Sequence, residues 1–153
     1  MTLDERGVLL RYLGKNREAV VRATVGLSDG ELRRVVVPSG TNLLGLLQHL
    51  TRMEEHWFQR VFLGEEPGGE DSWVVPADRT HDDVVAAYRA ACARSDGIVR
   101  DTPDLATLAR AVNPGEDELD PLRMIVAHMI EETARHAGHA DILRELIDGA
   151  TAL

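Results

Sequence analysis

The fold is decided by residues 120–149, DPLRMIVAHMIEETARHAGHADILRELIDG, which predict one long helix. Asp120 forms an N-cap, Pro121 suits the first helical position, and Gly149 suits a stop. The helix between these signals has roughly 28 residues and a length of about 42 Å, which is typical of a bundle helix. At about 100° per residue, one narrow face carries four apolar side chains: Ile125, Met129, Leu143 and Ile147.

A carboxylate and an imidazole interrupt this apolar face. Glu132 and His136 lie on it one turn apart, and burying a carboxylate costs several kcal/mol unless it is paired or binds a metal. The i, i+4 spacing places both side chains where they could share one ion. The alternative is an ion pair between Glu132 and an arginine from another helix, for example Arg11 or Arg60.

The second helix offers a third ligand. His49 and His56 are seven residues apart and lie on one side, at the edge of the apolar face. Taken singly, each is best interpreted as a histidine at the boundary of the core that is hydrogen-bonded to a neighbour. His49 could nevertheless complete a site of two histidines and one glutamate. Three protein ligands leave a position for water or substrate, as in catalytic metal sites. We expect His128 and His139 to be surface groups or to support the ligands, and His81 to face solvent.

The rest of the chain predicts an all-α four-helix bundle that forms a single domain over residues 1–153. One helix should begin at a capping box over residues 2–5 and fade near Gly26. Residues 28–31 predict a turn or a single helical turn, and residues 35–40 an extended connector. Two more helices should follow, one from Thr41 or Asn42 to Leu63 and one from Thr80, whose cap includes Asp83. The long connections over residues 64–79 and 101–119 leave room for crossover topology.

Composition excludes several classes of partner. The net charge of −9 argues against nucleic acid or an anionic membrane as a partner. The apolar runs are far shorter than a membrane span, and the N-terminus does not have a signal-peptide pattern. Cys92 is the single cysteine and cannot form a disulfide within the chain, so we expect a cytoplasmic protein in which Cys92 is a small buried side chain.

Aromatic residues suggest an assembly. Trp57, Phe58 and Phe62 lie on more than one side of the second helix. Residues 73–75, Trp-Val-Val, interrupt a polar connection and are too apolar to be free in solvent, so they should fold back over the bundle or over a partner. This is more apolar surface than one bundle face needs, and we therefore expect a homodimer.

Two segments resemble a known family. Residues 130–145, IEETARHAGHADILRE, together with LLQHL at residues 46–50, are similar to the DinB superfamily. The similarity is to its DUF664 branch in particular, close to mycothiol-dependent S-transferases and the N-terminal domain of mycothiol-dependent maleylpyruvate isomerase. The resemblance implies a four-helix bundle with a divalent metal, commonly zinc or nickel, held by His49, Glu132 and His136. Many members have histidine where Glu132 stands, and the glutamate matches the isomerase-like variant. We expect zinc.

The resemblance also implies a function. We expect a metal-dependent thiol S-transferase in which a low-molecular-weight thiol, mycothiol, is activated as a thiolate and attacks a small electrophile that the sequence does not identify. One alternative is a hydrolase that uses metal-bound water. Another is a metal-binding, stress-associated bundle protein without catalytic activity.

Overall fold

A computed structural model describes residues 3–69 and 72–152 of the chain. Within these residues the regular structure is helical, and the one β-type contact is an isolated bridge between Leu108 and Pro121. The all-α prediction is confirmed. The helices are α1 (Glu5–Arg22), α2 (Asp29–Arg33), α3 (Leu43–Glu54), its continuation η1 (Glu55–Phe62), α4 (His81–Asp101) and α5 (Leu122–Asp148).

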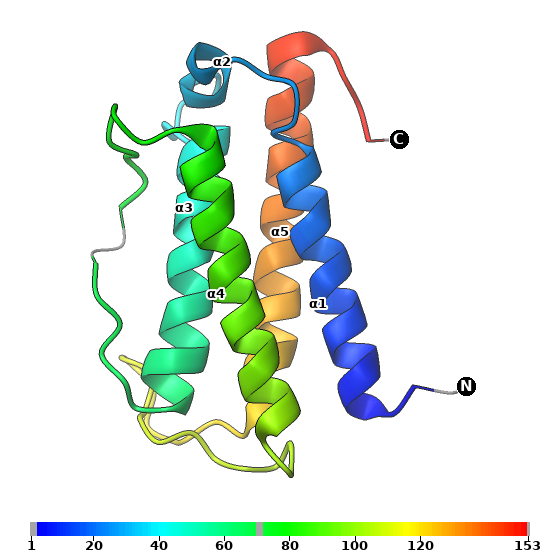
Figure 1. The fold of residues 1–153 in the computed structure, drawn as a ribbon, viewed down its shortest axis with the longest axis vertical. Helices are drawn as coiled ribbons and strands as arrows, with labels where there is room; N and C mark the ends of the chain where they lie inside the picture. The colour runs from blue at the N-terminus through cyan, green and yellow to red at the C-terminus, as the bar shows by residue number, and fades with distance from the viewer. Residues whose placement is uncertain (1–2, 70–71, 153) are drawn as a thin grey trace.

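The bundle contains a crossover (Figure 1). Helices α1 and α5 run in one direction, and α3 and α4 run in the opposite one. The connection between η1 and α4 therefore returns along the length of the bundle, beside α3, to the end where α3 began. The connection between α4 and α5 stays at the other end. The crossover, which the sequence left open, brings residues 72–75 alongside α3.

Most helix ends follow the local signals. Asn42 caps α3, Thr80 and Asp83 form a capping box on α4, and Gly149 ends α5 with a φ of 77°. The prediction for α5 was wrong by one residue, because Pro121 and not Asp120 is its N-cap. The carbonyl of Asp120 accepts a hydrogen bond from the backbone of Ala109 at 2.8 Å, which ties Asp120 to the preceding connection.

The start of α1 also differs. Its N-cap is Asp4, whose side chain accepts a hydrogen bond from the N–H of Gly7 at 2.8 Å. The predicted cap at Thr2 lies outside the described residues. The helix ends at Arg22, slightly before the predicted fade near Gly26.

The second predicted helix changes its hydrogen bonding along its length. It is α-helical to Glu54 and then π-helical over η1, which ends at Phe62 with Leu63 as its C-cap. Gly64, the predicted stop, follows with a φ of 69°. A π-helix uses i→i+5 hydrogen bonds, is rare, and occurs frequently at functional sites. Because each π turn holds more residues, side chains after Glu54 point in directions that an α pattern does not predict.

Buried apolar residues form two clusters, one at each end of the bundle. The first joins the end of α1, α2, α3, the start of α4 and the end of α5, and it includes Val75. The second joins the middle of α1, η1, the end of α4 and the start of α5, and it contains Trp57, Phe58 and Phe62. The homodimer remains a prediction, but these aromatic residues, on which it partly rested, are buried within the chain.

A buried ion pair lies between the two clusters. Arg17 of α1 donates two hydrogen bonds to the carboxylate of Glu54, both at 2.7 Å, and a third to Asp96 of α4 at 2.7 Å. Glu54 is 0% exposed and Arg17 5% exposed, so both charges are removed from water. Although burial lowers the pKa of Arg17, the attraction of Glu54 raises it above its usual value.

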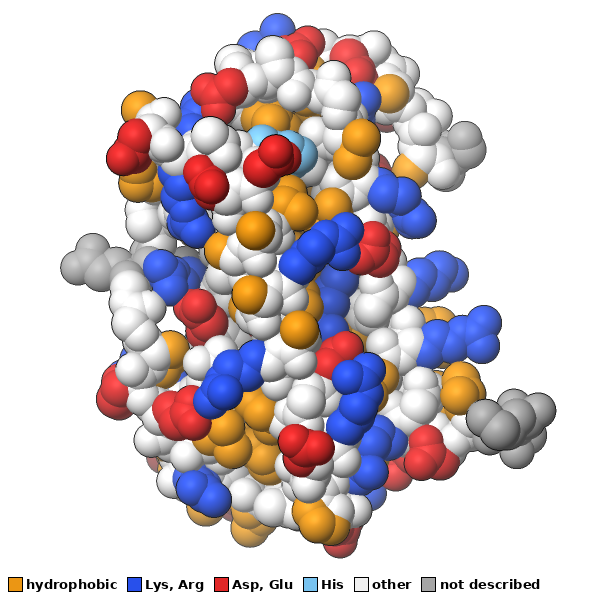
Figure 2. Space-filling model, in the orientation of Figure 1, with side chains coloured by type: hydrophobic (Ala, Val, Ile, Leu, Met, Phe, Trp, Pro, Cys, Tyr) orange, Lys and Arg blue, Asp and Glu red, His pale blue; other side chains and the backbone are white. Residues whose placement is uncertain are grey.

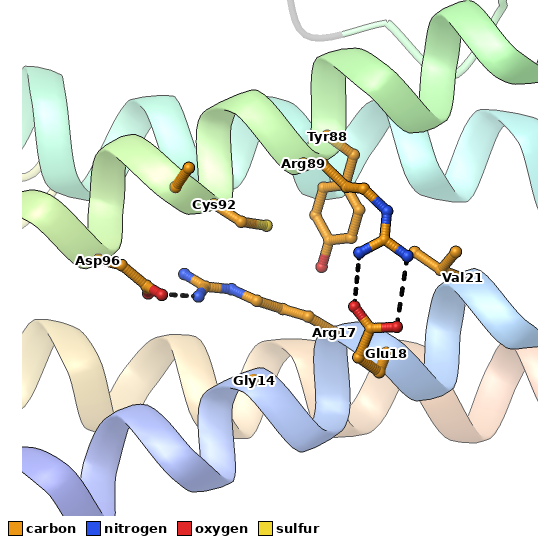
Figure 3. A pocket seen from close by; sticks show the side chains of 9 residues that line it. Gly14, Arg17, Glu18, Val21, Tyr88, Arg89, Cys92 and Asp96 are labelled. Carbon is orange, nitrogen blue, oxygen red and sulfur yellow. Dashed lines mark hydrogen bonds and ion pairs between the residues drawn. The ribbon is translucent and has the colours of Figure 1, made fainter.

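Cys92 faces this ion pair. Its Sγ lies 3.8 Å from Oε1 of Glu54, and the side chain lines a cavity of about 390 Å³ between α1 and α4 (Figure 3). Burial, followed by the neighbouring charge of Glu54, raises the pKa of the Cys92 thiol to about 12. The thiol is therefore protonated at neutral pH, which agrees with the prediction that Cys92 is not a nucleophile. The prediction that the side chain is buried holds only in part, because Cys92 is half-buried.

The surface shows no single-sign field on the face seen in Figure 2, where basic and acidic side chains are interspersed over the helices. None of the helices in residues 3–69 and 72–152 is long and apolar enough to cross a membrane.

Candidate metal centre

Helices α3 and α5 bring His49, Glu132 and His136 together. One ligand atom of each lies within 4.8 Å of the others. The Nε2 atoms of His49 and His136 lie 3.2 Å and 3.0 Å from Oε1 of Glu132. Ligands about 2.0–2.1 Å from a tetrahedral zinc ion lie about 3.3 Å from one another, so the two distances to Glu132 fit such an ion.

The structure does not place Glu132 against either of the arginines considered from the sequence. Arg60 faces Glu66 at 3.9 Å, and the arginine beside Glu132 is Arg135 of the same helix, at 3.6 Å. Arg135 is 57% exposed and also forms an ion pair with Glu131 at 2.8 Å. A partner so well solvated offsets little of the cost of burying Glu132.

The remaining histidines have other contacts. His56 Nε2 lies 2.8 Å from Oδ1 of Asn113, and the His128 ring lies 4.4 Å from that of Trp57. His139 supports the triad, because its Nδ1 lies 3.3 Å from Nδ1 of His136. The expectation that His81 faces solvent was wrong: it is half-buried, and its Nε2 lies 2.8 Å from the hydroxyl of Thr24.

The protonation states of the triad suit a cation. Burial raises the pKa of Glu132, but hydrogen bonds and charge interactions with His49 and His136 outweigh it, and the pKa is lowered overall. Burial also lowers the pKa of His136, and the attraction of Glu132 offsets this only in part. At neutral pH the site therefore presents a carboxylate and a neutral imidazole, the forms that bind metal.

The same shifts predict how the stability of the metal-free protein depends on pH. Ordinary pKa values are 6.5 for His136 and 4.5 for Glu132, and both are lowered in the folded state. The unfolded chain therefore takes up protons at higher pH than the folded chain does, and the free energy of unfolding falls as the pH drops below about 6.5. Urea unfolding from about pH 7.5 to about pH 4 checks this.

Other carboxylates also lower the free energy of unfolding in acid. The control therefore compares how steeply the free energy of unfolding falls with pH in the wild type and in a variant. A double variant, Glu132→Gln with His136→Gln, should lose stability less steeply with acid than the wild type. Equal slopes would contradict the assignment of the shifts to these two groups.

Trp73 covers the site. Its ring stacks on His49 with centroids 4.2 Å apart and meets the edge of His136 at 5.8 Å. The side-chain amide of Gln48 donates hydrogen bonds to the backbone carbonyls of Ser72 and Val74 and so holds this segment on α3. Residues 73–75 were predicted to fold back over the bundle or over a partner. Trp73 and Val75 do pack on the bundle, whereas Val74 is exposed. The contact of Trp73 with His49 was not foreseen.

Close packing at Gly45 explains how the backbone of this segment approaches α3. A Cβ atom at residue 45 would collide with the carbonyl oxygen of Trp73. Gly45→Ala should therefore displace the segment, destabilise the protein by about 1–3 kcal/mol, and change Trp73 fluorescence. Gly97→Ala on α4 is the matched control, because a Cβ there meets nothing within 4 Å. It should be neutral or stabilising by about 0.5–1 kcal/mol. Equal effects of the two substitutions would rule out this packing.

A groove opens beside Glu132. It has a volume of about 490 Å³ and lies between η1, α5 and the start of the crossover. Its lining residues are Arg52, Met53, Glu55, His56, Trp57, Arg60, Pro67, Gly68, Gly69, His128 and Glu132. A molecule in this groove would reach the triad from the side that Glu132 occupies.

The donor set fits a catalytic kind of zinc site. Two imidazole nitrogens and one carboxylate oxygen are ligands that zinc accepts, and three protein ligands leave a fourth position for water or substrate. Imidazole also suits nickel. The chemistry that this arrangement allows is the activation of a small nucleophile at the open position, beside the groove.

Comparisons with known proteins agree with the fold and identify a family. A family model described as mycothiol-S-transferase matches residues 8–149. No curated protein matches the sequence. The crystal structure of a conserved protein from Enterococcus faecalis has a TM-score of 0.71. It covers 97% of this chain and 100% of its own at 13% identity, and so shows likeness of fold alone.

Proposed function

The chain belongs to the mycothiol S-transferase family, and on that premise we propose that it joins mycothiol, through its sulfur, to a small electrophile in a metal-dependent reaction. The observation that carries the metal dependence is the convergence of His49, Glu132 and His136 beside an open groove. Zinc is the metal we propose, since two imidazoles and one carboxylate are a donor set that it commonly takes.

The metal ligands, Trp73 and the groove have separate roles in the proposed reaction. His49, Glu132 and His136 would hold the ion, and a bound divalent cation lowers the pKa of a thiol that coordinates it. Trp73 excludes water from the side of His49, which leaves the groove as the approach for the substrates. The sulfur forms a bond to an electrophilic carbon, the leaving group departs with its electron pair, and the thiol proton passes to water.

Turnover with and without thiol tests the proposal. Protein loaded with one equivalent of zinc is mixed with 1-chloro-2,4-dinitrobenzene and mycothiol, with the electrophile alone, or with glutathione in place of mycothiol. We expect release of chloride above the uncatalysed rate with mycothiol, and loss of that activity in metal-stripped protein.

The two alternatives give different results. A hydrolase would cleave an activated ester such as 4-nitrophenyl acetate without any thiol, and its rate would not respond to mycothiol. A non-catalytic metal-binding protein would retain zinc at one equivalent and show neither activity. Either pattern would overturn the transferase.

A further inference from the structure

The groove beside Glu132 has an uneven balance of charge and hydrogen-bonding groups. Its acidic members are engaged: Glu55 accepts a hydrogen bond from Arg52 at 2.6 Å, and Glu132 faces His49 and His136. The groups of the groove that can still form hydrogen bonds with a ligand are therefore mainly donors. A ligand that satisfies donors must be rich in acceptors.

Arg60 is the cation of this groove with the weakest ion pair. The one ion pair that it makes within the described residues joins its Nε to Glu66 at 3.9 Å, and the Glu66 side chain is 82% exposed. A solvent-exposed pair at this distance contributes little, so the Arg60 guanidinium is available to a ligand. Its planar fork of N–H groups matches a carboxylate, which can accept two parallel hydrogen bonds.

Arg52 builds the outer wall of the groove. Its guanidinium donates a hydrogen bond to the carbonyl of Gly68 at 2.8 Å and packs so closely on Gly69 that a Cβ there would collide with it. Gly69 has a φ of 102°, a conformation suited to glycine.

Apolar side chains complete the lining. Met53, Trp57 and Pro67 offer carbon surface beside the charged groups, which favours an organic ligand over an inorganic anion. Glu132 lines the same groove as Arg60, so a ligand whose anionic end binds Arg60 can reach the triad with its other end.

We propose that this groove binds the electrophilic substrate, and that this substrate carries a carboxylate which Arg60 recognises. The role of the ligand as an electrophile rests on the proposed function, whereas the binding of its carboxylate by Arg60 does not. Arg60 contacts the carboxylate and leaves it chemically unchanged. The sulfur forms its bond to carbon at the other end of the molecule, where the leaving group departs with its electron pair and the thiol proton goes to water.

Two matched electrophiles test the specificity. They are 4-(bromomethyl)benzoate and 4-(bromomethyl)benzamide, which share a bromide leaving group and differ in charge. With zinc-loaded protein and mycothiol, kcat/KM should be higher for the benzoate after correction for uncatalysed rates. Arg60→Gln should reduce the ratio of the two kcat/KM values by about tenfold or more, because a charge-assisted hydrogen bond is lost. Arg60→Lys, which retains the charge, should reduce it less.

A binding measurement separates this inference from the proposed function. The probe is 4-methylbenzoate, which cannot react, titrated into metal-free protein so that the carboxylate has no metal to bind. Wild type should bind it, and Arg60→Gln should weaken binding by about tenfold or more. The control Arg11→Gln removes an exposed arginine of α1 outside the groove and should bind like wild type.

The outcomes are distinct. Binding that depends on Arg60 without any thiol transfer would overturn the transferase and support the groove. Three results would overturn the carboxylate assignment. The first is transfer without a preference for the benzoate, and the second is an equal loss of kcat/KM with both electrophiles in Arg60→Gln. The third is binding of 4-methylbenzoate that Arg11→Gln weakens as much as Arg60→Gln does.

Discussion

Replacing Arg17 with methionine should lower the free energy of unfolding by roughly 3–5 kcal/mol. Methionine fills much of the space of the arginine stem but leaves the carboxylate of Glu54, which is 0% exposed, without its cation. Asp96 can turn to solvent or to Arg100, which lies 3.4 Å away, but Glu54 has no such outlet among the contacts that the structure gives it. Urea unfolding of the metal-free protein measures the loss.

Two further variants define the cause. Removing both charges with Arg17→Met and Glu54→Leu should cost less than Arg17→Met alone, because the stranded charge is gone. Arg89→Met breaks the exposed pair with Glu18 that is visible in Figure 3 and should cost about 0–1 kcal/mol. A loss at Arg17 no larger than that at Arg89 would show that burial of this ion pair does not control stability.

The second large effect concerns metal. Glu132→Gln should weaken zinc binding by about 100-fold or more, since a neutral amide is a poor zinc ligand and the substitution removes a negative charge beside the ion. In the metal-free protein the same change should alter stability by less than about 1 kcal/mol. Arg135, whose charge would lose a partner, is already solvated and still pairs with Glu131.

Competition with a chromophoric chelator gives the zinc affinity, and thermal melts of metal-stripped protein give the stability. Glu131→Gln is the matched control on the same helix, because the Glu131 side chain is 68% exposed and lies outside the triad. A sharp fall in the melting point of metal-free Glu132→Gln would indicate that Glu132 serves as an ion-pair partner, and would contradict the metal site.

The features that could be predicted from the sequence are those with local signals. The apolar face of residues 120–149 and the caps at Asn42, Thr80 and Gly149 depend on neighbours a few residues away. The pair Glu132 and His136 follows from the spacing within one helix. The second helix made His49 a candidate third ligand, but its assignment required a resemblance to a known family, because its distance from α5 depends on how the helices pack.

The crossover, the π-helical hydrogen bonding and the contact of Trp73 with His49 depend on tertiary packing, for which the sequence has no local pattern. The buried ion pair did have a signal. Glu54 is four residues after Leu50 and three before Trp57, so it lies on the apolar face of the second helix just as Glu132 lies on that of the last. The reasoning applied to Glu132 predicts a partner for Glu54 as well, although it does not identify Arg17.

The most direct test of the metal centre is a crystal structure of the protein with zinc, with anomalous diffraction measured on both sides of the zinc absorption edge. The account predicts one strong anomalous peak bonded to His49 Nε2, His136 Nε2 and a carboxylate oxygen of Glu132 at about 2.0–2.2 Å, with a further position open toward the groove. No peak between these residues at full zinc loading, or a zinc ion held elsewhere with Glu132 turned to Arg135, would contradict it.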